Sequence, residues 1–183
     1  MKQIYIPENP TSKFLFSSSK MAWFWLIVRV YVGWAWLETG WGKLQNEAWV
    51  GTDAGKAISG FVQGALSKTE GVHPDVQGWY AVFLENVVAP NAAAWSYAIA
   101  WGEVLVGVAL IIGALTGIAA FFGLFMNLNF RLAGTVSTNP VLFVLSIGII
   151  LAWRVAGHYG ADRYLLPLLG APWRPGDAFD RTS

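Results

Sequence analysis

Acidic, basic and amide side chains interrupt the long apolar runs of this chain. Glu38 and Glu103 have the chemistry to transfer protons, and Arg131 can hold an anion or the oxygen of a carbonyl group. Inside a membrane each such charge costs about 2.5–3.5 kcal/mol, so each should have a partner. We therefore expect Arg131 to pair with Glu103 or with Glu38.

The stretch from Gly123 to Pro140 shows how these groups are presented. The apolar helix predicted here has one face of small and polar residues, at helical spacing. They are Ala120, Gly123, Asn127, Arg131 and Gly134. In lipid the cheapest arrangement turns this face toward other helices. Asn129 lies off this face and needs its own neighbour, for which the fourth span is a candidate. We expect Asn127 to face a pocket.

The composition is that of an integral membrane protein. The chain has 183 residues, of which 55% are hydrophobic and 13% charged, against roughly 25% charged in soluble domains. Many of its 11 Trp and 11 Phe residues lie near the ends of apolar runs, a placement that membrane interfaces favour. The net charge is only +1, and the sequence has no basic run interleaved with aromatic residues. Nucleic acid is therefore not an expected partner.

Cysteine and histidine usage excludes several kinds of redox site. The chain has no cysteine, which removes disulfides, thiolate metal sites and covalent haem attachment. His73 and His158 are expected on opposite sides of the membrane, so neither a bis-histidine haem nor a histidine metal site is expected. P-loop, GxSxG, HExxH and Rossmann motifs are absent from the sequence.

The apolar runs predict an all-α integral membrane protein, a four-transmembrane-helix bundle. Its membrane domain, 21–159, has spans at about 21–44, 92–114, 115–134 and 140–158. The loop 45–91 carries two short amphipathic helices, one with Asp53 as a candidate cap and one with Pro74 as a candidate start. Residues 1–20 and 160–183 are expected to be surface tails.

Basic residues predict the orientation of this bundle. Those in the two tails favour both termini in the cytoplasm and the loop 45–91 outside, in a multi-pass protein of the cytoplasmic (inner) membrane. In the first span, Arg29 and Lys43 share one face and Glu38 points to the other. That helix either touches neighbours on both faces or breaks near Thr39.

The orientation sorts the buried polar residues by depth. The outer half holds Glu38, Lys43, Glu103, Asn127, Asn129, Arg131 and Asn139. The inner half or its interface holds Arg29, Arg154, His158, Asp162 and Arg163, and Asp162 or lipid headgroups are the candidate partners of Arg29. The outer cluster fits two interpretations equally: structural ion pairs that fix helix register, or a ligand pocket with the loop as its lid.

Several motifs resemble the DoxX/DoxD family of four-helix membrane proteins, which includes the small subunit of thiosulfate:quinone oxidoreductase. They are Arg29…Gly33…Gly40-x-x-Lys43, Gly102-Glu103 with Gly107, the run from Met126 to Pro140, and Gly157-His-Tyr-Gly-Ala-Asp-Arg163. The resemblance covers roughly Trp23 to Arg163. The loop 45–91 matches least clearly.

This resemblance implies a membrane subunit of a quinone-linked oxidoreductase. We expect Glu103, Arg131 and Glu38 to be the catalytic residues, and Asn127, Lys43 and Arg29 to bind substrate. Quinone is the candidate cofactor, and no covalently bound cofactor, haem or metal is expected. The expected partners are membrane lipid and other membrane or extracytoplasmic subunits. The alternative is a non-catalytic scaffold or anchor in a larger membrane complex.

Overall fold

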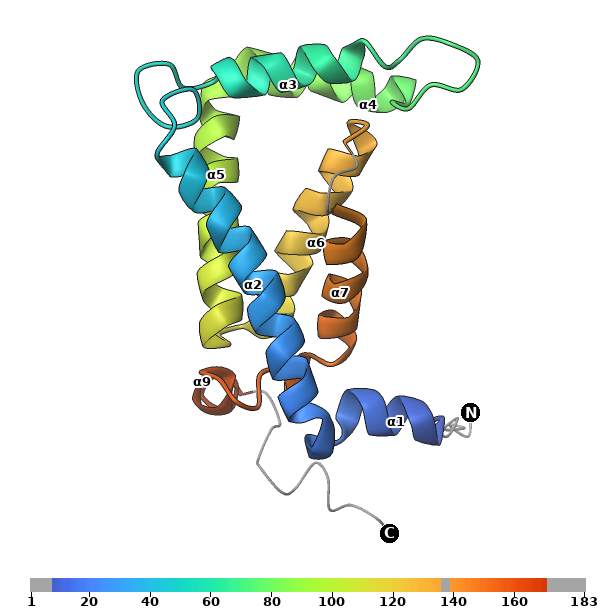
Figure 1. Ribbon diagram of the computed structural model, residues 1–183, viewed down its shortest axis with the longest axis vertical. Helices are drawn as coiled ribbons and strands as arrows, with labels where there is room; N and C mark the ends of the chain where they lie inside the picture. Colours follow the sequence, from blue (N-terminus) through green and yellow to red (C-terminus); the bar gives the residue numbers. More distant parts are fainter. Residues whose placement is uncertain (1–7, 136–138, 171–183) are drawn as a thin grey trace.

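The structure is a computed structural model that describes residues 8–135 and 139–170. All regular elements within those residues are helical, as predicted. Four long helices lie side by side and form the body of the molecule (Figure 1). They are α2 (Ala22–Leu44), α5 (Ala92–Ile112), α6 (Thr116–Leu132) and α7 (Asn139–Leu151).

A helical layer, which we call the cap, lies across one end of this bundle (Figure 1). It consists of α3 (Lys56–Leu66), α4 (Gly78–Phe83), the π-helical turn η2 (Leu84–Val88) and the 3₁₀ turn η3 (Ala89–Asn91). Its apolar residues, among them Ile58 and Leu84, pack together with Ala133 of the bundle. Helices lie in both places where the sequence predicts amphipathic helices, but the second is not a separate short helix.

The starts of both cap helices differ from the prediction. Gly55, in a left-handed conformation with φ 99°, precedes α3, and Asp53 instead pairs with Lys56 at the protein surface. The second helix begins at Gly78 and not at Pro74. From there the helix continues to Ile112, and it bends through η2 and η3, where Pro90 removes a backbone donor.

Two short helices lie at the end opposite the cap (Figure 1), α1 (Pro10–Ser17) and α9 (Asp162–Leu168). The 3₁₀ turn η1 (Ser19–Met21) joins α1 to α2, and α8 (Trp153–Ala156) follows α7. The indole of Trp25 donates a 2.7 Å hydrogen bond to the carbonyl of Leu15 and ties α1 to the bundle. The remaining parts of the two predicted tails, 1–7 and 171–183, lie outside the described residues.

The helix boundaries follow the predicted spans with two differences. The first span does not break near Thr39, because α2 is continuous to Leu44. The fourth helix ends at Leu151, and α8 follows after one residue. Among the described residues, one helical stretch, Gly78–Ile112, is long and apolar enough to cross a membrane, and α7 is apolar but shorter. Four membrane spans therefore stay a prediction.

Polar side chains lie inside the bundle and large apolar ones outside it. Arg29, Glu103 and Asn127 are each at most 1% exposed. On the outside, Trp34 is 61% exposed and Val144 is 65% exposed. Apolar side chains such as Val32 and Ile149 are buried as well, so the feature that differs from a soluble helical bundle is the large exposed apolar surface.

Candidate functional site

The ammonium group of Lys43 donates to both carboxylate oxygens of Glu103 and links the last turn of α2 to the middle of α5. The side chain of Glu103 is 1% exposed and that of Lys43 is 19% exposed. A carboxylate taken out of water needs such a partner, because its desolvation costs several kcal/mol. Both residues were predicted to belong to the site, but not as a pair.

Glycines bring α2 and α5 close enough for this pair to form. A Cβ added at Gly40 would lie 2.7 Å from the backbone nitrogen of Val104. A Cβ at Gly107 would lie 2.5 Å from the backbone nitrogen of Leu37. Only a residue without a side chain fits at either position, so the two helices cross in backbone contact. Lys43 lies three residues after Gly40 and therefore reaches α5 at Glu103.

Two aromatic rings surround the ammonium group of Lys43. Its nitrogen lies 4.8 Å from the centroid of Trp49 and 5.8 Å from that of Phe130. Aromatic faces attract cations at these distances while they exclude water. The pair is therefore enclosed by rings on the side that faces the cap.

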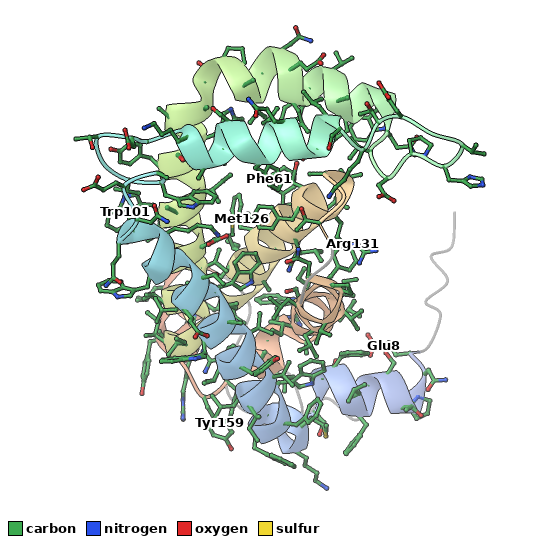
Figure 2. All side chains as sticks on the ribbon, turned by 45° about the horizontal axis from the view of Figure 1, so that its top comes forward. Glu8, Phe61, Trp101, Met126, Arg131 and Tyr159 are labelled. Atoms are coloured by element: carbon green, nitrogen blue, oxygen red, sulfur yellow. The ribbon has the colours of Figure 1, made fainter. Side chains whose placement is uncertain are left out.

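Phe130 also borders a chamber between the cap and the outer ends of α5 and α6, with a volume of about 110 Å³. Phe61 of α3 and Met126 of α6, both labelled in Figure 2, line this space from the cap side and from the bundle side. The full lining is Ile58, Phe61, Tyr80, Phe83, Leu84, Val88, Trp95, Ile99, Phe125, Met126, Asn129 and Phe130. Aromatic walls of this kind suit a flat ring.

The polar edge of the chamber comes from Tyr80 and Asn129. The Tyr80 hydroxyl lies 3.0 Å from the backbone carbonyl of Asn129 and 3.1 Å from its side-chain oxygen, and can donate to either. This contact ties the cap to α6. Neither residue was predicted to be a site residue, and the neighbour that Asn129 needed comes from the cap rather than from the fourth span. Tyr80 lies on the apolar face of the second predicted amphipathic helix. Its hydroxyl group, on an otherwise apolar face, is the feature of the sequence that could have identified it.

Asn127 lies deeper in the bundle. It is 0% exposed, and among the described residues neither atom of its amide has a hydrogen-bond partner. Residues 136–138, beyond α6, are not described. Asn129, not Asn127, lines the chamber.

Two other predicted site residues are exposed. Glu38 lies on the outer surface of α2. Arg131 is exposed on the side of α6 away from α5 (Figure 2), with its guanidinium 6.0 Å from the ring centroid of Phe143. The prediction that Arg131 pairs with Glu103 or Glu38 is wrong, because Lys43 occupies Glu103 and the last turn of α6 lets Arg131 extend outward.

Arg29 lies at the other end of the bundle. Its guanidinium donates to the carbonyl of Leu110 at 2.8 Å and to that of Tyr159 at 3.1 Å. Asp162 binds the same α5–α6 turn from the other side, by accepting from the backbone N–H groups of Leu115 at 2.5 Å and Thr116 at 2.8 Å. A cation at the end of α5 and an anion at the start of α6 both suit the helix dipoles. This arrangement holds the turn, far from the chamber.

Among the described residues, no group of three or more His, Cys, Asp or Glu side chains could hold a metal ion.

A family model, DoxX, matches residues 24–132. That is more than half of the chain. The chain belongs to the DoxX family. The matched region runs from α2 to α6, so it contains the Lys43–Glu103 pair, the whole cap and every residue that lines the chamber. No curated protein and no solved structure matches the chain.

Proposed function

We propose that this DoxX protein is a membrane subunit of a quinone-linked oxidoreductase that crosses the cytoplasmic membrane through α2, α5, α6 and α7. The outward faces of these helices support this topology, since Leu105 (64% exposed) and Phe122 (53%) are typical of them. In this topology α1 and α9 lie on the cytoplasmic side, with both termini, and the cap lies outside.

The chamber is the proposed site of the quinone ring. Its volume of about 110 Å³ is smaller than the roughly 150 Å³ of an engineered cavity that admits benzene, so the proposal requires the cap side chains to move apart when the ring binds. Its rings can stack on a flat ligand, and the Tyr80 hydroxyl can turn from Asn129 to donate to a carbonyl oxygen. The observation that carries the proposal is one arrangement: Phe130 separates an aromatic chamber with a polar edge from a buried acid–base pair.

The Lys43–Glu103 pair is the proposed store of an exchangeable proton. A quinone bound in the chamber takes up two electrons and two protons when it is reduced. Lys43 holds a proton against both carboxylate oxygens of Glu103, on the other side of the Phe130 ring, and can supply one of the two protons. Because Lys43 is 19% exposed, water can reprotonate it and so supply the second. A small rotation of that ring would connect the pair with the chamber. We assign the supply of electrons to a partner protein.

Quinone binding to the purified full-length protein in nanodiscs tests this function. The double variant Lys43→Met/Glu103→Gln removes both charges together, so no unpaired charge is left buried. We expect Tyr80→Phe to weaken quinone binding by about tenfold, which corresponds to about 1.4 kcal/mol. The double variant does not alter the chamber lining, so we expect it to keep quinone binding and to slow the reduction of bound quinone by a chemical reductant. Glu38→Gln is the matched control, because it neutralises an exposed acid next to the same crossing.

Two results would contradict the proposed function. One is a wild-type protein that binds no quinone. The other is a folded Tyr80→Phe variant that binds quinone as tightly as the wild type, together with a double variant that reduces bound quinone as fast as the Glu38→Gln control.

The alternative, a non-catalytic scaffold, rests on the exposed apolar residues of the cap region. Val72 is 91% exposed, Trp79 is 64% exposed and Val82 is 56% exposed. On a surface proposed to lie outside the membrane, such residues favour a protein partner. Affinity purification from native membranes separates the two functions: a stoichiometric partner without co-purified quinone would favour the scaffold.

A further inference from the structure

A second hollow runs along the outside of the bundle between α5 and α6, with a volume of about 570 Å³. Side chains from one face of each helix line it, including Ala98, Gly102 and Leu105 on α5 and Ile118, Phe122 and Phe125 on α6. Along α6 it extends from Leu115 to Met126, which is about 17 Å of helix. We call it the α5–α6 groove.

The α5–α6 groove lies directly beside the chamber. The two hollows share the side chains of Trp95, Ile99, Phe125 and Met126. A molecule with its head in the chamber could therefore extend along the outside of the bundle, toward the end where α5 turns into α6. The groove faces the same side as the exposed rings of α6, which in the proposed topology is the lipid side.

Packing between helices does not require a glycine at position 102, which lies in the groove. A Cβ added there would touch nothing nearer than the sulfur of Met126, at 3.6 Å, which is an ordinary contact. Gly40 and Gly107, by contrast, lie against backbone atoms of the neighbouring helix. A glycine in the middle of a helix costs about 1 kcal/mol relative to alanine, and the helix crossing does not explain it at position 102.

The lining of the groove and chamber selects among membrane lipids. None of the residues that line either hollow is charged, and the hydrogen-bonding groups at the chamber edge, the Tyr80 hydroxyl and the Asn129 amide, are neutral. A phosphate headgroup would lie in this site without a cation, which is unfavourable. A neutral ring that carries one flexible hydrocarbon chain fits both hollows.

We propose that the α5–α6 groove holds the isoprenoid tail of a quinone whose ring occupies the chamber. This inference rests on the proposed function and adds to it a binding site for the tail of the quinone. Gly102 and its neighbours determine affinity for the tail, while Tyr80 and Asn129 contact the ring.

A comparison of tailed and tail-less quinones tests the groove. The full-length protein in nanodiscs is titrated with a ubiquinone that carries several isoprene units and with its tail-less ring analogue. Gly102→Leu places a side chain in the groove next to Met126. Gly42→Leu is the matched control, because Gly42 is also a helical glycine with open space around it, on an exposed face of α2.

We expect Gly102→Leu to weaken binding of the tailed quinone by about tenfold relative to Gly42→Leu, and to leave binding of the tail-less analogue unchanged. On the wild type, affinity should rise with tail length until the groove is filled. Equal binding of the tailed quinone to both glycine variants, or no dependence on tail length, would overturn the groove and leave the ring site standing. A wild-type protein that binds neither ligand would overturn the ring site itself.

Discussion

Lys43 and Glu103 form their ion pair directly beside the point where α2 and α5 touch through backbone atoms. Glu103 itself lies against that contact, because a Cβ at Gly40 would be 2.9 Å from the Cβ of Glu103. The charge pair and the glycine contact are therefore parts of one interface, and each has its own measurable consequence.

Removing one member of the pair should destabilise the protein more than removing both. Lys43→Met or Glu103→Gln leaves a buried group without its partner, and we expect each to cost about 3 kcal/mol, toward the lower end for buried pairs because Lys43 is partly exposed. The double variant should cost less than either single variant. Equilibrium unfolding with a denaturing detergent measures this, and additive costs of the two single changes would contradict it.

A methyl group at Gly107 should separate α2 from α5. Its Cβ would lie 2.5 Å from the backbone nitrogen of Leu37, which cannot give way as a flexible side chain can. We expect Gly107→Ala to lower the free energy of unfolding by about 1–3 kcal/mol or more. Gly42→Ala, where a Cβ meets no atom within 4 Å, should be neutral or stabilising. Equal effects of the two substitutions would show that the close crossing is not required.

Asp162 should stabilise the turn between α5 and α6. Asp162→Ala removes the acceptor for the backbone N–H groups of Leu115 and Thr116, so we expect a loss of about 1–2 kcal/mol. Amide hydrogen exchange at those two residues should accelerate, while exchange in the middle of α5 should not. Arg163→Ala, at the exposed neighbouring position, serves as the control. Unchanged exchange at Leu115 in the Asp162 variant would contradict this role.

The absence of cysteine makes the proposed topology directly testable. A single cysteine at His73, in the loop between the cap helices, should react with a membrane-impermeant maleimide on intact cells or spheroplasts. A single cysteine at Glu8, next to α1, should react only after the membrane is opened. Both positions are exposed in the structure, so access depends on the membrane alone. The reverse labelling pattern would invert the topology, and labelling of both would exclude it.

Local sequence patterns predicted the elements well. Apolar spacing located the starts of the four long helices closely, because amphipathic periodicity depends only on neighbours along the chain. It did not locate the end of the fourth helix, which is Leu151 and not residue 158, or the continuity of the second cap helix with α5. The residues that begin the cap helices were predicted less well. Asp53 has the right residue type to cap a helix, but the left-handed turn at Gly55 places the start of α3 after it.

The pairing of charges was not predicted from residue types. Arg131 and Glu103 have compatible charge and depth, but the partner of Glu103 depends on where α2 crosses α5. The signal existed in the glycines: Gly33 and Gly40 on one helix, with Gly107 on the other, predict a close crossing that brings Lys43 to Glu103. Spacing of small residues carries information on helix contacts that charge counting does not.

The sequence by itself determined the helical class, the membrane-like composition, the DoxX family and the set of charges that lie within or beside the apolar runs, since these follow from composition, periodicity and motif. Only the tertiary structure decided which of those charges meet, and that Asn129 rather than Asn127 lines the chamber beneath the cap. Tyr80 became a candidate site residue in the same way, through its contact with a residue 49 positions further along the chain. Such contacts depend on helix crossing and on the position of the cap, and no local pattern specifies either.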